Sequence, residues 1–235
     1  SNSLMSKFLF LIIALTTFSS LFGQPSSRQL DTSEIDQLVT EDLKAKLNIN
    51  YSIYRAYEYQ DKLGTHYLIL TENQDANGLK PDYNDSIKAF CLSKIGSDLQ
   101  LEWQLRDFIY PESESNPIEY SIWFWTKYLS LTDLDNDGII EPIIIYGTSG
   151  MNGTDDGRIK ILTYYKGEKR AIRHQNGVHD SERNTQVDKL FYQLPNSART
   201  AVIEIMQRIT SDQNGIFPYG WEANMKLGKL HFDEN

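Results

Sequence analysis

Hydrophobic and polar residues alternate with a period of two along much of the chain, which is the pattern of half-buried β-strands. The alternating segments face each other across short polar turns and predict three β-hairpins, over residues 51–72, 86–108 and 158–175. The third hairpin turns at Lys166-Gly167-Glu168. Two further strand-like segments, 119–132 and 142–148, lie on either side of a short acidic turn.

A different spacing, of three and four residues between apolar positions, predicts one helix near each end of the chain. The N-terminal apolar set is Ile35, Leu38, Val39, Leu43 and Leu47. The C-terminal set is Ala198, Val202, Ile205, Met206 and Ile209. Ser33 stands where it could cap the first helix, and Pro195 stands where a helix start tolerates proline.

Together these elements predict an α+β fold, in which a meandering antiparallel β-sheet is flanked by an N-terminal and a C-terminal helix. Three segments follow from this reading. Residues 1–23 are a signal peptide, residues 24–50 a linker with a short helix, and residues 51–235 a single α+β domain that carries the acidic turn.

The first residues have the layout of a secretory signal peptide. A basic start at Lys7 precedes an apolar run over residues 8–18, and small residues supply a cleavage point after Gly23. The apolar run is shorter than the roughly 20 residues that a membrane-spanning helix needs. The sequence therefore predicts a periplasmic or secreted protein with no membrane span after cleavage.

Charge and cysteine content narrow the classes of partner. The chain has 32 acidic and 23 basic residues, a net charge of -9, which argues against nucleic acid and anionic membrane surfaces and is compatible with cations. Cys91 is the single cysteine, so no intrachain disulfide can form. Its place in an alternating segment predicts a buried core thiol rather than a nucleophile.

The acidic turn concentrates like charge between two strands. Unit charges 4 Å apart repel by about 4 kcal/mol at an effective dielectric near 20, so a divalent cation is the expected partner. Oxygen ligands on a flexible loop suit Ca²⁺ better than Mg²⁺, and Gly138 permits the sharp bend. The predicted ligands are Asp133, Asp135, Asp137, the carbonyl of Ile139, and Glu141. A turn that simply solvates its charges is the alternative.

An EF-hand needs a glutamate at the twelfth position of its loop, where this chain has Ile144. The shorter spacing Asp-x-Asp-x-Asp-Gly-x-x-acid instead resembles the calcium loops of integrin α-chain repeats (FG-GAP modules) and related bacterial secreted repeats. In those families the loop joins adjacent antiparallel strands, which the resemblance implies here as well. The resemblance covers about fifteen residues. The chain departs from those families in carrying one copy, with Glu141 in place of the commoner Asp and Pro142 after it.

A second polar concentration, residues 169–183, follows the last predicted hairpin. Forked guanidinium groups suit phosphate, carboxylate or acidic sugar, so an anion site is one interpretation. The candidate ligand-binding residues are Arg173, His174, His179, Asp180 and Arg183. The histidine spacing matches no zinc pattern. A solvated loop whose charges pair locally is the alternative.

Catalytic motifs are not evident. Residues 147–157 form neither a nucleophile elbow nor a phosphate-binding loop. The acids Glu112, Glu114 and Glu119 lie in or beside one loop, but their spacing singles out no glycosidase pair. The four tryptophans are assigned to core packing by default, with stacking on sugars as the alternative.

Residues 130–148, the segments "GRIKIL" and "IRHQNG", and the late amphipathic helix together look like a group of small exported proteins of Gram-negative bacteria, mostly of unknown function. Some of those proteins are named for surface polysaccharide or lipopolysaccharide biosynthesis. The resemblance implies an envelope role and no catalytic residue. We therefore expect an exported calcium-binding envelope protein, a non-catalytic binding or accessory component that contacts surface polysaccharide or an envelope protein. An enzyme acting on envelope glycan and a protein-interaction module with an open sheet edge are the alternatives.

Overall fold

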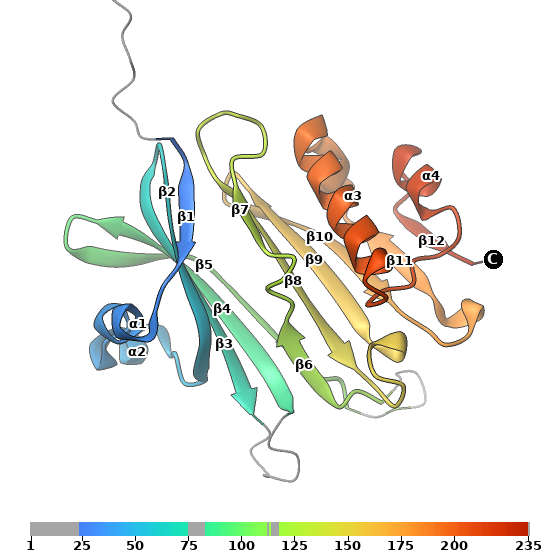
Figure 1. Ribbon diagram of the computed structural model, residues 1–235, viewed down its shortest axis with the longest axis horizontal. Helices are drawn as coiled ribbons and strands as arrows, with labels where there is room; N and C mark the ends of the chain where they lie inside the picture. The colour runs from blue at the N-terminus through green and yellow to red at the C-terminus, as the bar shows by residue number, and fades with distance from the viewer. Residues whose placement is uncertain (1–23, 75–82, 112, 114–117, 235) are drawn as a thin grey trace, which may run out of the picture.

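The computed structural model describes residues 24–74, 83–111, 113 and 118–234. Strands dominate these residues and form two antiparallel sheets, with four short α-helices around them (Figure 1). The predicted α+β fold, with one meandering sheet and a helix at each end, is therefore wrong. The predicted signal peptide lies outside the described residues.

The first sheet is a simple antiparallel meander whose strands follow chain order. Its strands are β1 (Ser26–Gln29), β2 (Ser52–Asp61), β3 (Gly64–Gln74), β4 (Asn84–Ile95) and β5 (Asp98–Phe108). Two helices, α1 (Thr32–Leu38) and α2 (Glu41–Leu47), connect β1 to β2 and lie on the outer face of this sheet (Figure 1).

The second sheet has the order β12-β11-β10-β9-β8-β6, and β7 also pairs with β8. Its strands are β6 (Ser121–Phe124), β7 (Ser130–Thr132), β8 (Glu141–Ser149), β9 (Arg158–Tyr165), β10 (Glu168–Gln175), β11 (Asn184–Val187) and β12 (His231–Asp233). The other helices are α3 (Asn196–Ser211) and α4 (Trp221–Lys226), with single 3₁₀ turns η1 (Thr154–Asp156), η2 (Asp180–Glu182) and η3 (Lys189–Gln193).

The layers stack in the order helices, first sheet, second sheet, helices (Figure 1). Alternation along the strands explains this order, because successive side chains point to opposite faces. Leu68 and Leu70 of β3 face the second sheet, whereas Tyr67 and Ile69 pack toward α1 and α2. The sheet faces are apolar on both sides, so a single sheet with one exposed face could not bury them.

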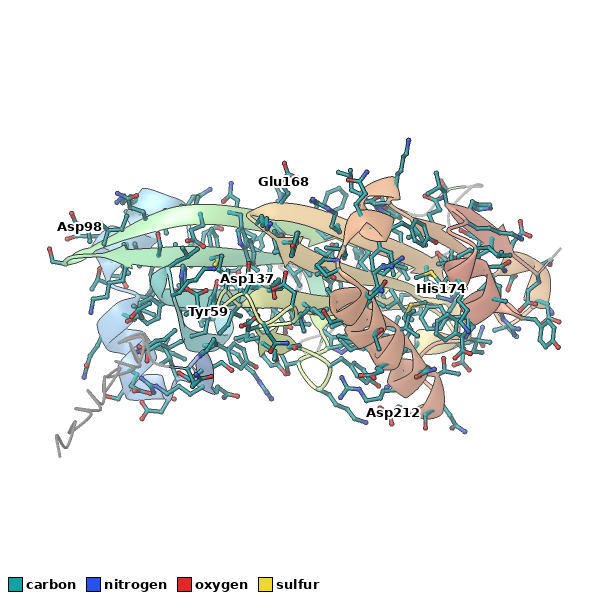
Figure 2. The ribbon with its side chains drawn as sticks, turned by 90° about the horizontal axis from the view of Figure 1, so that it is seen from above. Tyr59, Asp98, Asp137, Glu168, His174 and Asp212 are labelled. Atoms are coloured by element: carbon teal, nitrogen blue, oxygen red, sulfur yellow. The ribbon has the colours of Figure 1, made fainter. Side chains whose placement is uncertain are left out.

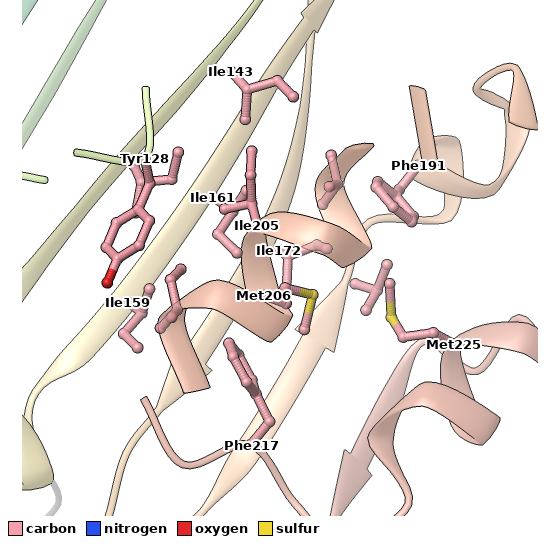
Figure 3. Close-up of a cluster of buried hydrophobic side chains, with 14 of the residues drawn as sticks. Tyr128, Ile143, Ile159, Ile161, Ile172, Phe191, Ile205, Met206, Phe217 and Met225 are labelled. Carbon is pink, nitrogen blue, oxygen red and sulfur yellow. The ribbon is translucent and has the colours of Figure 1, made fainter. Parts of the chain in front are cut away.

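The outer face of the second sheet is covered mainly by α3. Figure 3 shows the apolar side chains Ile205 and Met206 of α3 against the strand residues Ile159, Ile161 and Ile172. All five side chains are at most 3% exposed. The predicted C-terminal helix is thus present over Asn196–Ser211, with Pro195 at its N-cap as expected.

Several local predictions hold, and the N-terminal ones need correction. All three hairpins form, and Lys166 and Gly167 turn the third with φ angles of 50° and 76°, as a two-residue turn requires. The single N-terminal helix is two helices, because Thr40 caps a new start. The first is capped by Asp31 rather than Ser33, and the expected linker contains strand β1.

Cys91 is fully buried between the sheets, as predicted. Among the described residues, no helix is long and apolar enough to cross a membrane.

Candidate metal centre

The acidic loop, residues 133–141, connects β7 to β8 within the second sheet. These strands pair antiparallel, with Thr132 opposite Glu141, so the loop closes directly across the pair. Asn136 and Gly138 have φ angles of 60° and 86°, and both residue types tolerate this left-handed region. The loop therefore has the position that the resemblance to FG-GAP modules implies.

Four carboxylates converge inside this loop. Oxygen atoms of Asp133, Asp135, Asp137 and Glu141 all lie within 4.8 Å of one another. Oxygens on opposite sides of a Ca²⁺ ion are separated by about 4.6–5.2 Å, because each Ca–O bond is about 2.3–2.6 Å long. The cluster could hold a metal ion, and its dimensions and donor set fit calcium.

Hydrogen bonds from the loop backbone orient these carboxylates. Asp133 accepts from the N–H groups of Asp137 at 3.1 Å and Gly138 at 2.8 Å. Glu141 accepts from the Leu134 N–H at 2.7 Å. An ionised carboxylate has about four acceptor sites, and these donors occupy two on Asp133 and one on Glu141, so acceptor positions remain for a cation. The predicted carbonyl ligand belongs to Ile139, which is half-buried and donates its own N–H to Asp137 at 2.8 Å.

Glu141 shows how poorly the cluster is neutralised by protein groups alone. Its side chain is almost inaccessible, with 2% exposure. Burial raises the pKa of Glu141 to about 7, and the charges of the three aspartates add to the rise, although the hydrogen bond from Leu134 opposes it. A divalent cation at the cluster would supply the positive charge that these carboxylates lack.

The β2–β3 turn of the first sheet forms hydrogen bonds with the acidic loop of the second sheet. The Lys62 N–H donates to the Gly138 carbonyl at 2.9 Å, and the Lys62 ammonium donates to the Asp137 carbonyl. Asp61 accepts from the Ile140 N–H at 3.1 Å. The loop is therefore a junction between the two sheets, and its order affects both.

Two of the other candidate ligand residues, Arg173 and His174, lie on β10 and are engaged within the protein. Arg173 pairs with Asp188 at 2.6 Å. His174 is 3% exposed, with hydrogen bonds from Thr185 at 2.9 Å and to Asn176 at 2.8 Å. Burial lowers the pKa of His174 to about 4, so its ring is neutral at pH 7.

The remaining candidates, His179, Asp180 and Arg183, lie at the η2 turn. Arg183 donates to Asp180 at 2.6 Å and also lies 3.4 Å from Glu234. His179 is exposed and lies next to Asp180 in the chain. Figure 2 shows His174 well away from Asp137. The structure thus separates this segment from the acidic loop and pairs its charges locally, and ligand binding there stays a prediction.

Comparison with known proteins shows no family. No protein-family model matches the chain, and no solved structure matches it significantly. A segment of 117 residues is 24% identical to Hexokinase-1 of Pongo abelii. That match covers 50% of this chain and 13% of the hexokinase, and at this identity it carries no activity over.

A second polar cluster, beside the acidic loop, escaped the sequence analysis. It contains Asp61, His66 and Glu102, which come from three different strands of the first sheet. The one sign of this cluster in the sequence is His66, a polar residue of β3 on the same inward-facing side as Leu68 and Leu70. Glu102 carries no such signal, because a break in strand register determines where it points.

Proposed function

We propose that this protein binds one Ca²⁺ ion at the acidic loop and acts as an exported, non-catalytic binding or accessory component of the cell envelope, linked to surface polysaccharide. The observation that carries the calcium proposal is the convergence of four carboxylates within 4.8 Å. The export and envelope proposals rest on the signal-like N-terminus and the resemblance described above. The ion would be a structural clamp, because the loop joins the two sheets through Asp61 and Lys62.

The experiment is thermal unfolding of the chain from Gln24 onward, with Ca²⁺ and with chelator. Extracellular calcium sites bind at about 10⁻⁴–10⁻³ M. For a Kd near 10⁻⁴ M, about 2 mM Ca²⁺ stabilises the folded state by about 2 kcal/mol. For a domain of this size, that raises Tm by about 4–8 °C.

Asp135→Asn removes one ligand charge while keeping the shape of the side chain, and should abolish the rise in Tm. Asp98→Asn is the matched control, since Asp98 is the first residue of β5 and lies far from Asp137 (Figure 2). It should leave the response to calcium unchanged. A Tm that ignores calcium in the unsubstituted chain would overturn the proposal, as would a full response in Asp135→Asn.

A further inference from the structure

A cavity of about 310 Å³ opens between the two sheets next to the acidic loop. Its walls come from both sheets and include Tyr59, Trp103, Tyr164 and the loop residues Ile139 and Ile140. Ligand pockets in proteins usually begin near 300 Å³, so the cavity has room for one small molecule.

His66 is the polar centre of this cavity. It is 4% exposed and lies between two carboxylates, with Nε2 3.3 Å from Asp61 and Nδ1 3.1 Å from Glu102. Despite the short distance, Nδ1 is buried and makes no hydrogen bond of acceptable geometry. Nδ1 therefore has Glu102 as a charged neighbour without a well-formed hydrogen bond to it.

Glu102 is directed into the cavity by a β-bulge. Cys91 of β4 is opposite Trp103, and Leu92 is opposite Leu101, so Glu102 is the extra residue of β5. Bulges of this kind re-aim side chains and are frequent beside binding sites. The Glu102 side chain remains 33% exposed, and a ligand in the cavity can therefore reach it.

Aromatic rings supply the apolar surfaces. Tyr59 stacks on His66 with ring centroids 4.8 Å apart, and Trp103 stacks on Tyr164 with centroids 3.6 Å apart. Trp103 is only partly buried, so its ring remains available as a wall of the cavity. Such faces pack against the C–H groups of a sugar ring, while carboxylate oxygens accept its hydroxyl protons.

The charges of the lining favour an uncharged ligand. Burial works against protonation of His66, but the carboxylates of Asp61 and Glu102 on either side of the ring prevail and raise its pKa to about 9. His66 is therefore cationic at pH 7. With Lys166 at the rim, two cations balance the two carboxylates, and neither an anion nor a cation gains a net attraction.

We propose that this cavity binds a neutral pyranose sugar, stacked on Trp103 and hydrogen-bonded to Glu102, and that calcium at the acidic loop is required for binding. The second part rests on the proposed calcium function. The physical link is direct, because Ile139 and Ile140 form part of the wall and Asp61 holds the Ile140 N–H at 3.1 Å. A loop ordered by Ca²⁺ fixes this wall, whereas repulsion among the free carboxylates loosens it.

The test uses the chain from Gln24 onward, with tryptophan fluorescence and calorimetry as readouts. The probes are methyl glucoside, methyl galactoside and N-acetylglucosamine, each titrated to about 10 mM, which is enough to saturate a weak site with a Kd of about 1 mM. We expect at least one probe to bind in Ca²⁺ and to lose about tenfold or more of its affinity in chelator. Glu102→Gln should cause a similar loss in Ca²⁺, since a charged acceptor is replaced by a neutral amide oxygen that forms a weaker hydrogen bond. Glu41→Gln, whose side chain is 88% exposed on α2, is the matched control and should bind as the unsubstituted chain does.

The outcomes separate this inference from the proposed function. If calcium raises Tm but no sugar probe binds, the sugar site is refuted and the calcium site stands. Equal affinity in Ca²⁺ and chelator refutes the coupling, and unchanged affinity in Glu102→Gln refutes the location. Tetramethylammonium serves as a further probe, and its binding in place of the sugars would overturn the assignment to an uncharged ligand.

Discussion

The ion pair between Glu119 and Arg158 offers a sharp test of how the two sheets are joined. Glu119 is 1% exposed and Arg158 10% exposed at the side chain. Arg158 donates to Glu119 through Nε and also through Nη2 at 2.9 Å. Glu119 accepts two more hydrogen bonds, from Thr148 at 2.9 Å and from the Tyr110 N–H at 2.7 Å. The carboxylate is therefore fully engaged in a place that water does not reach.

Glu119→Ala should destabilise the protein far more than loss of a surface ion pair. Among the described residues, the carboxylate left near the buried guanidinium of Arg158 would be Asp107, at 3.5 Å, and Asp107 already pairs with Lys160 at 2.6 Å. Removing one partner of a buried pair costs about 3–5 kcal/mol, because the other charge is left uncompensated. At about 2–4 °C per kcal/mol for a domain of this size, Tm should fall by about 6–20 °C.

Urea unfolding followed by circular dichroism measures this cost, and a double-mutant cycle assigns it. Arg158→Met added to Glu119→Ala removes the stranded charge, so the double variant should cost about 2 kcal/mol less than the sum of the single ones. Glu168→Ala is the control, because Glu168 is 71% exposed in its pair with Arg170 and should cost less than about 1 kcal/mol. A cost of Glu119→Ala no larger than that of this control, or additive costs of the two substitutions, would contradict a stranded charge on Arg158.

Two further predictions concern pH and backbone packing. Burial lowers the pKa of His66, but Asp61 and Glu102 outweigh it and raise the pKa from 6.5 to about 9. Protonated His66 therefore contributes up to about 3 kcal/mol to the free energy of unfolding. This stabilisation is complete below about pH 6.5 and is lost as the pH rises through about 9. Urea midpoints should fall over that range and should fall much less in His66→Gln; a midpoint that stays level contradicts the assignment. Gly157→Ala should cost about 3 kcal/mol in the same assay, since its Cβ would lie 1.9 Å from the Thr148 carbonyl oxygen, and a cost below about 1 kcal/mol would show that the two strands separate easily.

Local patterns predicted the features of this protein that depend on neighbours in the chain. The hairpins follow from alternation plus a turn, and the Lys166-Gly167 turn is visible from residue type alone. The carboxylates of the acidic loop come from nine consecutive residues, so their convergence depends only on the bend that Asn136 and Gly138 permit. The spacing of the acidic residues was therefore enough to predict the candidate metal centre without knowledge of the fold.

Features that depend on long-range pairing were missed. Alternation does not show that β6 pairs with β8 instead of β5, yet that choice turns one predicted sheet into two. The strands β1, β11 and β12 are three or four residues long, too short for a period of two to be recognised. The break between α1 and α2 depends on Thr40, whose hydroxyl accepts from the Leu43 N–H at 3.3 Å and caps a new helix inside one apolar pattern.

The cavity cluster was beyond sequence reasoning for a related physical reason. Asp61, His66 and Glu102 are spread over 42 residues, and they meet only because β2, β3 and β5 lie in one sheet. Glu102 also needs the bulge opposite Cys91 and Leu92, which changes the face of the strand that it occupies. A pattern with strict alternation places Glu102 on the wrong face.

The two sheets are joined by different interactions at the two ends of β8. Near Thr148, the buried Glu119–Arg158 pair is linked to the first sheet by a hydrogen bond from Arg158 to the Phe108 carbonyl of β5 at 2.9 Å. Near Glu141, four carboxylates lie close together, and the Lys62 ammonium is 3.8 Å from Asp137. The charges at the first end are paired within the protein, whereas the cluster at the second end could hold a metal ion. Calcium would then act on one end of the inter-sheet core, which is also the end that contains the cavity, while the opposite end keeps the sheets together. Under these two proposals, calcium would stabilise the fold by about 2 kcal/mol and order the cavity wall, while the Glu119–Arg158 end would hold the sheets together without it.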